Sequence, residues 1–211
     1  MKITTIASSS AGCCYLVESG GEQLLIECGI PLKKIREALK HDLSRVVGCL
    51  VSHEHNDHCQ AWKDIKNKTT IPVVMPYHNN CITSSEFNVN VADLFHDVAC
   101  YGYIVRDKRS LLFYASDTGE LPYRIKGLTH LMIEANYDMD ILLDSEQNDA
   151  LRARIADNHL SIDQAIEFAL RHKDTLQEVH LLHLSDRHSN EADFLKRAQE
   201  ALGVPVYVAK K

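Results

Sequence analysis

The sequence predicts an α/β protein in which two mixed β-sheets are flanked by helices. Short apolar segments crowd the first half of the chain, whereas helices and strands alternate in the second half, and this order is typical of layered α/β domains. The 211 residues are 45% hydrophobic and 25% charged, which is enough apolar material for a sizeable core. We therefore expect residues 1–211 to form one domain.

The expected elements follow from apolar runs and from their spacing. Strands are predicted at residues 2–6, 14–17, 23–27, 46–51, 73–75, 100–106, 110–115, 128–134, 178–184 and 204–209. Helices are predicted at residues 31–39, 161–171 and 191–202, and Ser161 is a candidate N-cap of the second one. Residues 78–90 are too polar to assign, and the polar residues 140–158 form either an exposed helix or a flexible excursion.

The most informative segment directly follows the strand predicted at residues 46–51. Residues 52–58 read Ser-His-Glu-His-Asn-Asp-His. His53 and His55 alternate along an extended backbone and can point the same way, whereas Asp57 and His58 come after a turn and can face a second point. Nitrogen and oxygen donors arranged in this way favour two ions of zinc or a similar first-row metal. A solvated His-rich loop is the alternative, and the position at a strand end argues against it.

The spacing His53-x-His55-x-Asp57-His58 resembles the signature of the metallo-β-lactamase superfamily. This resemblance implies an αββα sandwich with a dinuclear metal site at one edge. It also implies a further histidine, a bridging aspartate and a final histidine later in the chain.

Candidates for these three ligands stand beside predicted strands. Asp117 begins the segment Asp-Thr-Gly at the end of an apolar strand. On its own this segment could equally be an ordinary turn, and by resemblance to the superfamily Asp117 is the bridging aspartate. His96 alone would be a structural histidine, and its position before Asp117 is that of the third family histidine, with Asp97 beside it to orient the ring. His183 lies at a strand end, whereas His180 is expected to be a partly buried structural residue.

The expected metal site then has two ligand sets that share one aspartate. One set is His53, His55, His96 and Asp117, and the other is Asp57, His58, Asp117 and His183. Asp57 is also counted among the catalytic residues. Two close cations, zinc or manganese, would lower the pKa of a bridging water enough to make hydroxide a nucleophile at neutral pH.

Two further segments resemble those of ribonuclease Z, a branch of this superfamily that cleaves phosphodiesters. Glu134-Ala and His159-Leu-Ser look like its His-Glu-Ala-Thr and His-Ser-Thr segments. By this resemblance His159 gives a proton or a hydrogen bond to the substrate, and Glu134 holds and polarises it. Helix capping or exposure is the alternative for His159. A role in tRNA 3′ processing is not expected, because residues 107–109 leave room only for a tight turn.

The compact YycJ/WalJ-like exonuclease branch is a closer match over nearly the whole chain. The match includes the Ser/Gly-rich loop at residues 8–16, Leu-Leu-Ile-Glu-Cys-Gly at residues 24–29, and the segments Glu-Ala-Asn, Asn-His-Leu-Ser and His-Leu-Ser-x-x-His. It implies a metal-dependent nuclease that acts on DNA with 5′-exonuclease character. Arg187, His188 and Ser161 are candidate contacts for the substrate phosphate, and the first two are equally solvated loop residues.

Composition leaves other functions open. The net charge of −6 does not favour a large non-specific surface for nucleic acid, although bound metals would add local positive charge. Small cyclic or linear nucleotides are therefore an alternative substrate. Thioester or lactam hydrolysis shares the histidine run but does not need Glu134 and His159. A non-catalytic metal-binding domain is the last alternative, and the sequence does not set the oligomeric state.

The cellular location is inferred from what the chain lacks. No apolar segment is long enough to cross a membrane, and residues 1–6 resemble a first strand rather than a secretory signal. The seven cysteines include no Cys-x-x-Cys pair, which favours reduced thiols over a disulfide framework. Cys59 is assigned to packing. We therefore expect a cytoplasmic protein with no membrane partner.

Overall fold

Two β-sheets face each other at the centre of the structure, a computed structural model that describes residues 1–77, 82 and 84–210. The first sheet has the order β1-β2-β3-β4-β5, and the second has the order β11-β10-β9-β8-β7-β6. The strands of the first sheet are β1 (Lys2–Ser9), β2 (Gly12–Ser19), β3 (Glu22–Ile26), β4 (Val46–Leu50) and β5 (Val73–Val74). Those of the second are β6 (Asn88–Leu94), β7 (Cys100–Arg106), β8 (Leu111–Ala115), β9 (His130–Glu134), β10 (Glu178–Leu182) and β11 (Val206–Val208).

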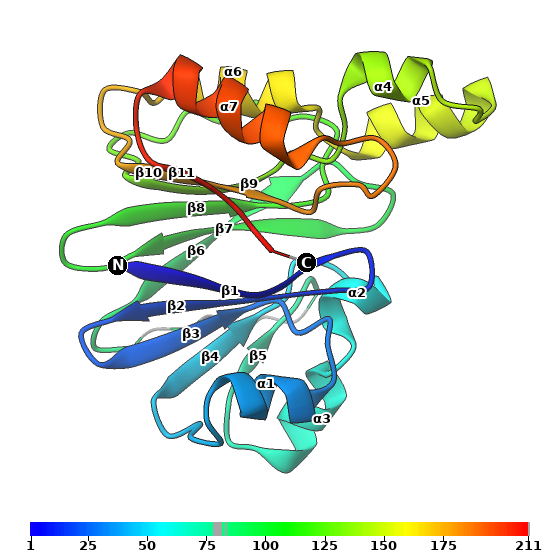
Figure 1. The fold of residues 1–211 in the computed structure, drawn as a ribbon. Coiled ribbons are helices and arrows are strands. Elements are labelled where there is room, and N and C mark those ends of the chain that lie inside the picture. The colour runs from blue at the N-terminus through cyan, green and yellow to red at the C-terminus, as the bar shows by residue number, and fades with distance from the viewer. Residues whose placement is uncertain (78–81, 83, 211) are drawn as a thin grey trace.

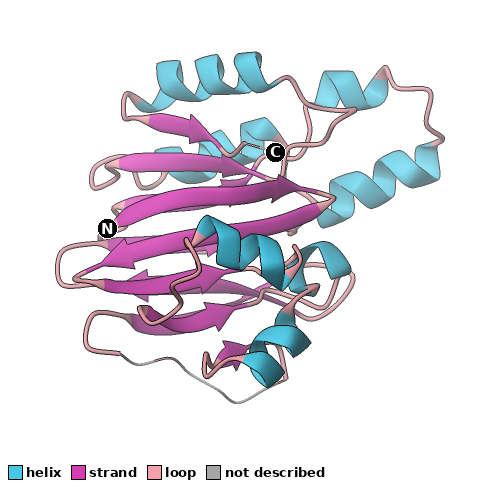
Figure 2. Ribbon diagram, turned by 60° about the horizontal axis from the view of Figure 1, so that its bottom comes forward, coloured by secondary structure: helices cyan, strands magenta, loops and turns pink. Residues whose placement is uncertain are grey.

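Helices cover the outer face of each sheet, so the layers are αββα (Figures 1 and 2). The first sheet carries α1 (Leu32–Ala38), α2 (Asn56–Cys59) and α3 (Trp62–Lys68). On the second sheet α6 (Ile162–Leu170) and α7 (Glu191–Leu202) lie over the outer face, whereas α4 (Met139–Leu143) and α5 (Asp149–Asn158) lie beside them at one end of the sandwich. Both sheets are mixed, since β1 to β3 and β6 to β8 pair antiparallel while β3 to β5 and β8 to β11 pair parallel. The predicted fold class is confirmed.

Three apolar clusters fill the spaces between these layers. Along β2, Cys13, Tyr15 and Val17 pack between the sheets, whereas Cys14 and Leu16 pack towards the helices on the first sheet. The third cluster lies between the second sheet and α6 and α7. Strands covered on both faces need apolar residues at consecutive positions, which explains the continuous apolar runs in the sequence.

Most predicted elements are present with small differences at their ends. The strand predicted at residues 178–184 stops at Leu182, because His183 has a left-handed φ of 52°. The unassigned residues 78–90 include the start of β6, whose pattern is polar because most of its first side chains are exposed at the sheet edge. Residues 78–81 and 83 lie outside the described residues. The polar stretch at residues 140–158 forms most of α4 and all of α5.

Two expectations about the chain's chemistry also have structural outcomes. The described cysteines are all free thiols, and the Cys59 thiol is buried and donates to the Glu54 carbonyl at 3.3 Å. None of the helices in the described part of the chain combines the length and the apolar character that crossing a membrane requires.

Candidate metal centre

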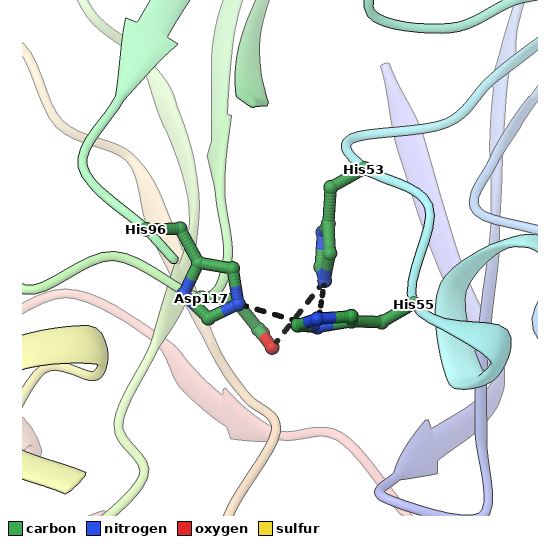
Figure 3. Close-up of side chains that lie close together, drawn as sticks. All are labelled: His53, His55, His96 and Asp117. Atoms are coloured by element: carbon green, nitrogen blue, oxygen red, sulfur yellow. Dashed lines mark hydrogen bonds and ion pairs between the residues drawn. The ribbon is translucent and has the colours of Figure 1, made fainter. Parts of the chain in front are cut away.

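The first predicted ligand set converges at the end of the sandwich where α2 begins. Figure 3 shows the rings of His53 and His55 approaching from one side and His96 with Asp117 from the other. His53 Nε2 lies 3.0 Å from His55 Nδ1, which lies 3.3 Å from His96 Nε2, and His53 Nε2 lies 3.8 Å from Asp117 Oδ2. One donor atom from each of the four residues falls within 4.8 Å of the others, so the set can hold a metal ion.

The other nitrogen of each imidazole in this set also has a neighbour. His53 Nδ1 lies 2.8 Å from Ser52 Oγ, and His96 Nδ1 lies 3.3 Å from the Asn158 carbonyl. Asp97 Oδ1 lies 3.4 Å from His55 Nε2 and 3.3 Å from His96 Nε2. Asp97 was expected to orient the His96 ring alone, but it lies beside both His55 and His96. The outer nitrogen of His96 faces the Asn158 carbonyl rather than Asp97. Such outer contacts fix the ring orientation of a metal ligand.

His53 is held in the neutral form that binds metals. Its ring is fully buried, and burial together with the charge of His58 lowers the pKa of His53 to about 2. A neutral imidazole keeps a lone pair for coordination at neutral pH.

The second predicted set lies beside the first and shares Asp117 with it. His58 Nε2 lies 3.6 Å from Asp57 Oδ2 and 3.5 Å from Asp117 Oδ2. His183 Nε2 lies 3.6 Å from Asp57 Oδ2, and His183 Nδ1 lies 3.0 Å from Asp117 Oδ1. The Nε2 atoms of His58 and His183 are buried and have no hydrogen-bond partner among the described residues. Two orphaned imidazole nitrogens facing carboxylates fit a divalent cation.

Opposing effects set the charge of the shared carboxylate. Burial raises the pKa of Asp117, but the imidazoles of His183 and His58 outweigh burial and hold this pKa well below its usual range. Burial also raises the pKa of the Asp57 carboxyl, but the neighbouring imidazoles of His183 and His58 outweigh burial and lower this pKa. Both aspartates are therefore ionised at neutral pH, as metal ligands must be.

Three non-glycine residues at this edge have left-handed backbone conformations. Glu27 follows β3 with φ 62°, Asp117 follows β8 with φ 45°, and His183 follows β10 with φ 52°. Such conformations cost energy and are enriched at functional sites. Here each one turns a side chain into the site at the point where its strand stops.

Glu27 lies next to His58 of the second ligand set. Its carboxylate is fully buried and accepts hydrogen bonds from the Tyr114 hydroxyl at 2.8 Å and from the Ser52 N–H at 3.2 Å. Glu27 Oε1 also lies 3.4 Å from His58 Nδ1. Glu27 therefore lies next to the outer nitrogen of a predicted metal ligand.

Glu134 and His159 form a hydrogen-bonded pair next to the ligands. Glu134 Oε1 lies 2.7 Å from His159 Nδ1 and 2.9 Å from His183 Nδ1, and Glu134 Oε2 accepts from the Leu160 N–H at 3.2 Å. Burial lowers the pKa of His159, but the charge of Glu134 outweighs burial, so that this pKa lies above its ordinary value. His159 is the C-cap residue of α5, so the alternative of a capping position also describes it.

Sequence reasoning did not include Cys13 among the site residues. Its sulfur and one nitrogen each of His58 and His183 lie within 4.8 Å of one another, and all three residues are buried. The thiol also lies 3.5 Å from the Ser9 carbonyl. The adjacent pair Cys13-Cys14 was a signal that one thiol faces the space between the sheets, but it does not say which one.

A pocket of about 280 Å³ opens over the ligands, and we call it the site pocket. It is lined by Ser10, His55, Asp57, His96, Asp97, Asp117, Leu151, Arg154, Ile155, Asn158, His159 and His183. The three predicted phosphate contacts are outside this lining. The Ser161 hydroxyl accepts the Gln164 N–H in the capping box of α6. In the loop after β10, the His188 ring is buried beside Ser185, and the Arg187 side chain is exposed.

The chain is similar in sequence to one protein family and to two named relatives. The model of the metallo-beta-lactamase superfamily matches residues 10–134. The exodeoxyribonuclease YycJ of Bacillus anthracis is 26% identical, with 88% of this chain and 83% of that protein covered. The exodeoxyribonuclease WalJ of Streptococcus pneumoniae serotype 2 is 25% identical, with 87% and 81% covered.

Solved structures share the fold at lower identity. The metallo-beta-lactamase fold protein YhfI from Bacillus subtilis superposes with a TM-score of 0.72 at 18% identity, covering 99% of this chain and 96% of that one. The short form of human tRNase Z gives 0.63 at 14% identity, covering 89% and 94%. A diphosphatase from the PhnP family gives 0.66 at 15% identity, covering 99% and 94%.

Proposed function

Because the chain belongs to the metallo-beta-lactamase superfamily, we propose that it is a dinuclear metal-dependent phosphodiester hydrolase, a DNA nuclease with 5′-exonuclease character. The observation that carries this proposal is the Glu134–His159 hydrogen bond of 2.7 Å beside the ligand sets. Hydrolysis of a thioester or a lactam has no need of such a pair. Hydrolysis of a DNA phosphodiester breaks a P–O bond and expels a sugar alkoxide, which is a poor leaving group until it is protonated.

The metals would be held by the two ligand sets that share Asp117. When bound, zinc or manganese would stabilise the charge that develops on the phosphoryl group and lower the pKa of water. The fixed carboxylates of Asp57 and Asp117 keep each ligand set anionic, which favours divalent cations.

His159 is assigned the proton transfer. Its Nδ1 faces Glu134, which leaves the Nε2 atom to hold a proton for the leaving oxygen. Glu134 is fully buried and stabilises the protonated ring by its charge. The same carboxylate contacts His183, so the ring that handles the proton and a metal ligand are held in one fixed arrangement.

DNA is the proposed substrate because the relatives matched over four fifths of their length are named exodeoxyribonucleases. The β7–β8 connection is a tight turn in which the N–H groups of Arg109 and Ser110 donate to the Asp107 carboxylate. A tight turn at this position argues against tRNA 3′ processing and is therefore consistent with DNA as the substrate. We expect the enzyme to act in the cytoplasm, where the free thiols of its described cysteines would stay reduced.

Small linear or cyclic nucleotides are the second candidate substrate. The site pocket measures only about 280 Å³, a size that accepts a nucleotide unit. The chain as a whole has a net charge of −6, which does not attract a long polyanion.

The experiment is cleavage of end-labelled single- and double-stranded DNA by protein stripped of metal and reloaded with zinc or manganese. His159→Ala and Asp117→Ala are compared with His180→Ala, whose ring bonds to Glu178 at 3.1 Å and lies outside the site. Metal-dependent shortening from the 5′ end that is lost in the first two variants alone would support the proposal. Hydrolysis of a simple phosphodiester without DNA cleavage would favour small nucleotides. Inactivity on both would refute phosphodiester hydrolysis and leave the thioester and non-catalytic alternatives.

A further inference from the structure

One wall of the site pocket is the face of α5 that carries Leu151, Arg154 and Ile155. These positions are three and four residues apart, so their side chains lie on the same side of the helix. None of the residues of α5 is buried, and the Leu151 side chain is 39% exposed. The apolar side chains of this helix therefore contribute to the pocket wall rather than to a core.

The C-terminal end of α5 is fixed against the metal ligands. The Asn158 carbonyl lies 3.3 Å from His96 Nδ1. A Cβ atom on Gly119 would lie 2.0 Å from the Asp157 carbonyl oxygen, so the helix end packs directly on the loop that carries Asp117. The wall thus has a defined position relative to the site at which phosphate would be bound.

Arg154 is the one arginine or lysine among the described residues that line the site pocket. Its Nη2 atom donates to Asp97 Oδ2 at 3.1 Å, and its side chain is 68% exposed. An ion pair with this much solvent around it is weak and exchanges readily. A phosphate can therefore replace Asp97 as the partner of the guanidinium, and arginine binds phosphate oxygens through two donors at once.

A single carboxylate separates Arg154 from the ligand rings. Asp97 contacts Arg154 through Oδ2 and lies 3.3 Å from His96 and 3.4 Å from His55 through Oδ1. A phosphate on Arg154 would then be next to, and not at, the position of the phosphate that is cleaved. We assign these two positions to neighbouring phosphates along one strand.

We propose that α5 binds the nucleotide adjoining the scissile bond, with Arg154 on the neighbouring phosphate and Leu151 and Ile155 against the sugar and base. This inference rests on the proposed function and names how that site recognises its substrate. Apolar side chains contact a base without reading its edge, so the wall accepts every base. Strand polarity would be recognised through the second phosphate.

The test compares three dinucleotides that contain the same internal bond: TpT, 5′-phosphorylated pTpT and 3′-phosphorylated TpTp. The wild-type protein is expected to cleave one of the two phosphorylated forms about 10- to 100-fold faster, in kcat/KM, than TpT, a range that corresponds to one charged hydrogen-bonded contact. Arg154→Ala should abolish this advantage, measured as the ratio of kcat/KM on the phosphorylated dinucleotide to kcat/KM on TpT within the same variant, and Arg154→Lys should retain part of it. Using the ratio removes any effect that the loss of the Asp97 partner has on hydrolysis of all three substrates. The matched control is Arg152→Ala on the same helix, since Arg152 donates to the Ser145 carbonyl outside the site pocket.

The apolar part of the wall has its own comparison. Leu151→Ala should slow hydrolysis of all three dinucleotides about 3- to 10-fold, because part of the contact with an unpaired base is lost. Leu143→Ala is the control, since Leu143 is an exposed leucine on α4 and does not line the site pocket. All the substituted side chains are at least partly exposed, so thermal unfolding should confirm that each variant folds.

The outcomes separate the inference from the proposed function. Cleavage of all three dinucleotides at one rate, or an advantage that survives in Arg154→Ala, would overturn the role of α5 while the phosphodiesterase stands. No cleavage of any dinucleotide by the metal-loaded wild-type protein, with DNA also intact, would remove the proposed function itself.

Discussion

Glu134 Oε1 lies 2.7 Å from Nδ1 of His159 and 2.9 Å from Nδ1 of His183. One buried carboxylate oxygen thus holds both the imidazole that is assigned to the proton and an imidazole of the second ligand set. The two rings lie 5.8 Å apart between their centroids. The imidazole proposed for proton transfer and a predicted metal ligand are therefore held in place by a single side chain.

The leaving group decides how much His159 contributes. We expect His159→Ala to lower kcat on DNA about 100- to 10,000-fold, the range for loss of a general acid. On bis(4-nitrophenyl) phosphate the loss should be small, because nitrophenolate leaves without protonation. Steady-state kinetics on the two substrates measures the difference. Equal losses on both would show that His159 acts on the metal site or the fold instead.

Cys13 is expected to give the second ligand set a sulfur donor. Burial raises the pKa of the Cys13 thiol, so the thiol stays protonated until a cation displaces the proton. Thiolates prefer zinc and cobalt to manganese. The cobalt-loaded protein should therefore show a sulfur-to-cobalt charge-transfer band in its near-ultraviolet spectrum that is missing in Cys13→Ser.

Cys14 provides the control for this measurement. It is equally buried but packs on the opposite face of β2, with the cluster beneath α1. Cys14→Ser should keep the band. A spectrum that is the same in the wild type and in Cys13→Ser would limit Cys13 to packing and leave the metal choice to nitrogen and oxygen donors.

The convergence of the candidate ligands was predictable because most of them lie within a few residues of a strand end. His53 and His55 alternate after β4, and Asp117 and His183 lie within two residues of β8 and β10. The residues that lie between the sheets and the site were harder to predict. β2 has apolar side chains on both faces, so its alternation says nothing about whether Cys13 or Cys14 faces the ligands. Only the packing of the second sheet against β2 decides this.

The pocket wall could not be predicted for a different reason. A helix is recognised in a sequence by the apolar stripe that it buries, and α5 buries none of its residues. Nothing in the sequence therefore distinguishes Arg154 from the other charged residues of this polar stretch. Arg187 and His188 follow a ligand in sequence, but the chain after β10 carries them away from the site pocket.

Asp138 makes stability depend on pH outside the metal site. Its carboxylate accepts from Arg197 at 2.6 Å and caps α4 through the Asp140 N–H at 2.9 Å. Burial raises the pKa of Asp138, but these hydrogen bonds outweigh burial and lower it. A lowered pKa stabilises the fold above the unfolded-state value of about 4, and this stability is lost as the pH falls through the folded-state value.

Asp138→Asn keeps the helix cap and removes the charge. We expect a loss of about 1 kcal/mol in the free energy of unfolding at pH 7, which disappears as the pH falls below about 4. Urea unfolding of the metal-free protein measures it. Asp144→Asn, at the exposed C-terminal end of α4, should change stability by less than about 0.5 kcal/mol. A difference between Asp138→Asn and the wild type that persists unchanged at low pH would contradict the assignment.

Gly29 fixes the backbone of the second ligand set. A Cβ atom at this position would lie 1.6 Å from the carbonyl oxygen of Asp57 and 2.8 Å from the His58 nitrogen. Both neighbours are backbone atoms, and the segment is tied down on each side by the bonds from Cys28 to the His58 carbonyl at 2.9 Å and from Gly29 to the Cys13 carbonyl at 2.8 Å. The added methyl group can be accommodated only if Asp57 and His58 move together.

Gly29→Ala should therefore destabilise the protein by about 1–3 kcal/mol and weaken the second ligand set selectively. Titration calorimetry should show one metal ion bound tightly, through His53, His55 and His96, where two are expected in the wild type. In Gly102→Ala the new Cβ would lie 3.0 Å from its nearest neighbour, a much milder crowding, and the stoichiometry should stay unchanged. Two tight ions in a folded Gly29→Ala protein would mean that Asp57 and His58 tolerate displacement, and the dinuclear site would then depend less on backbone position than on the shared carboxylate of Asp117.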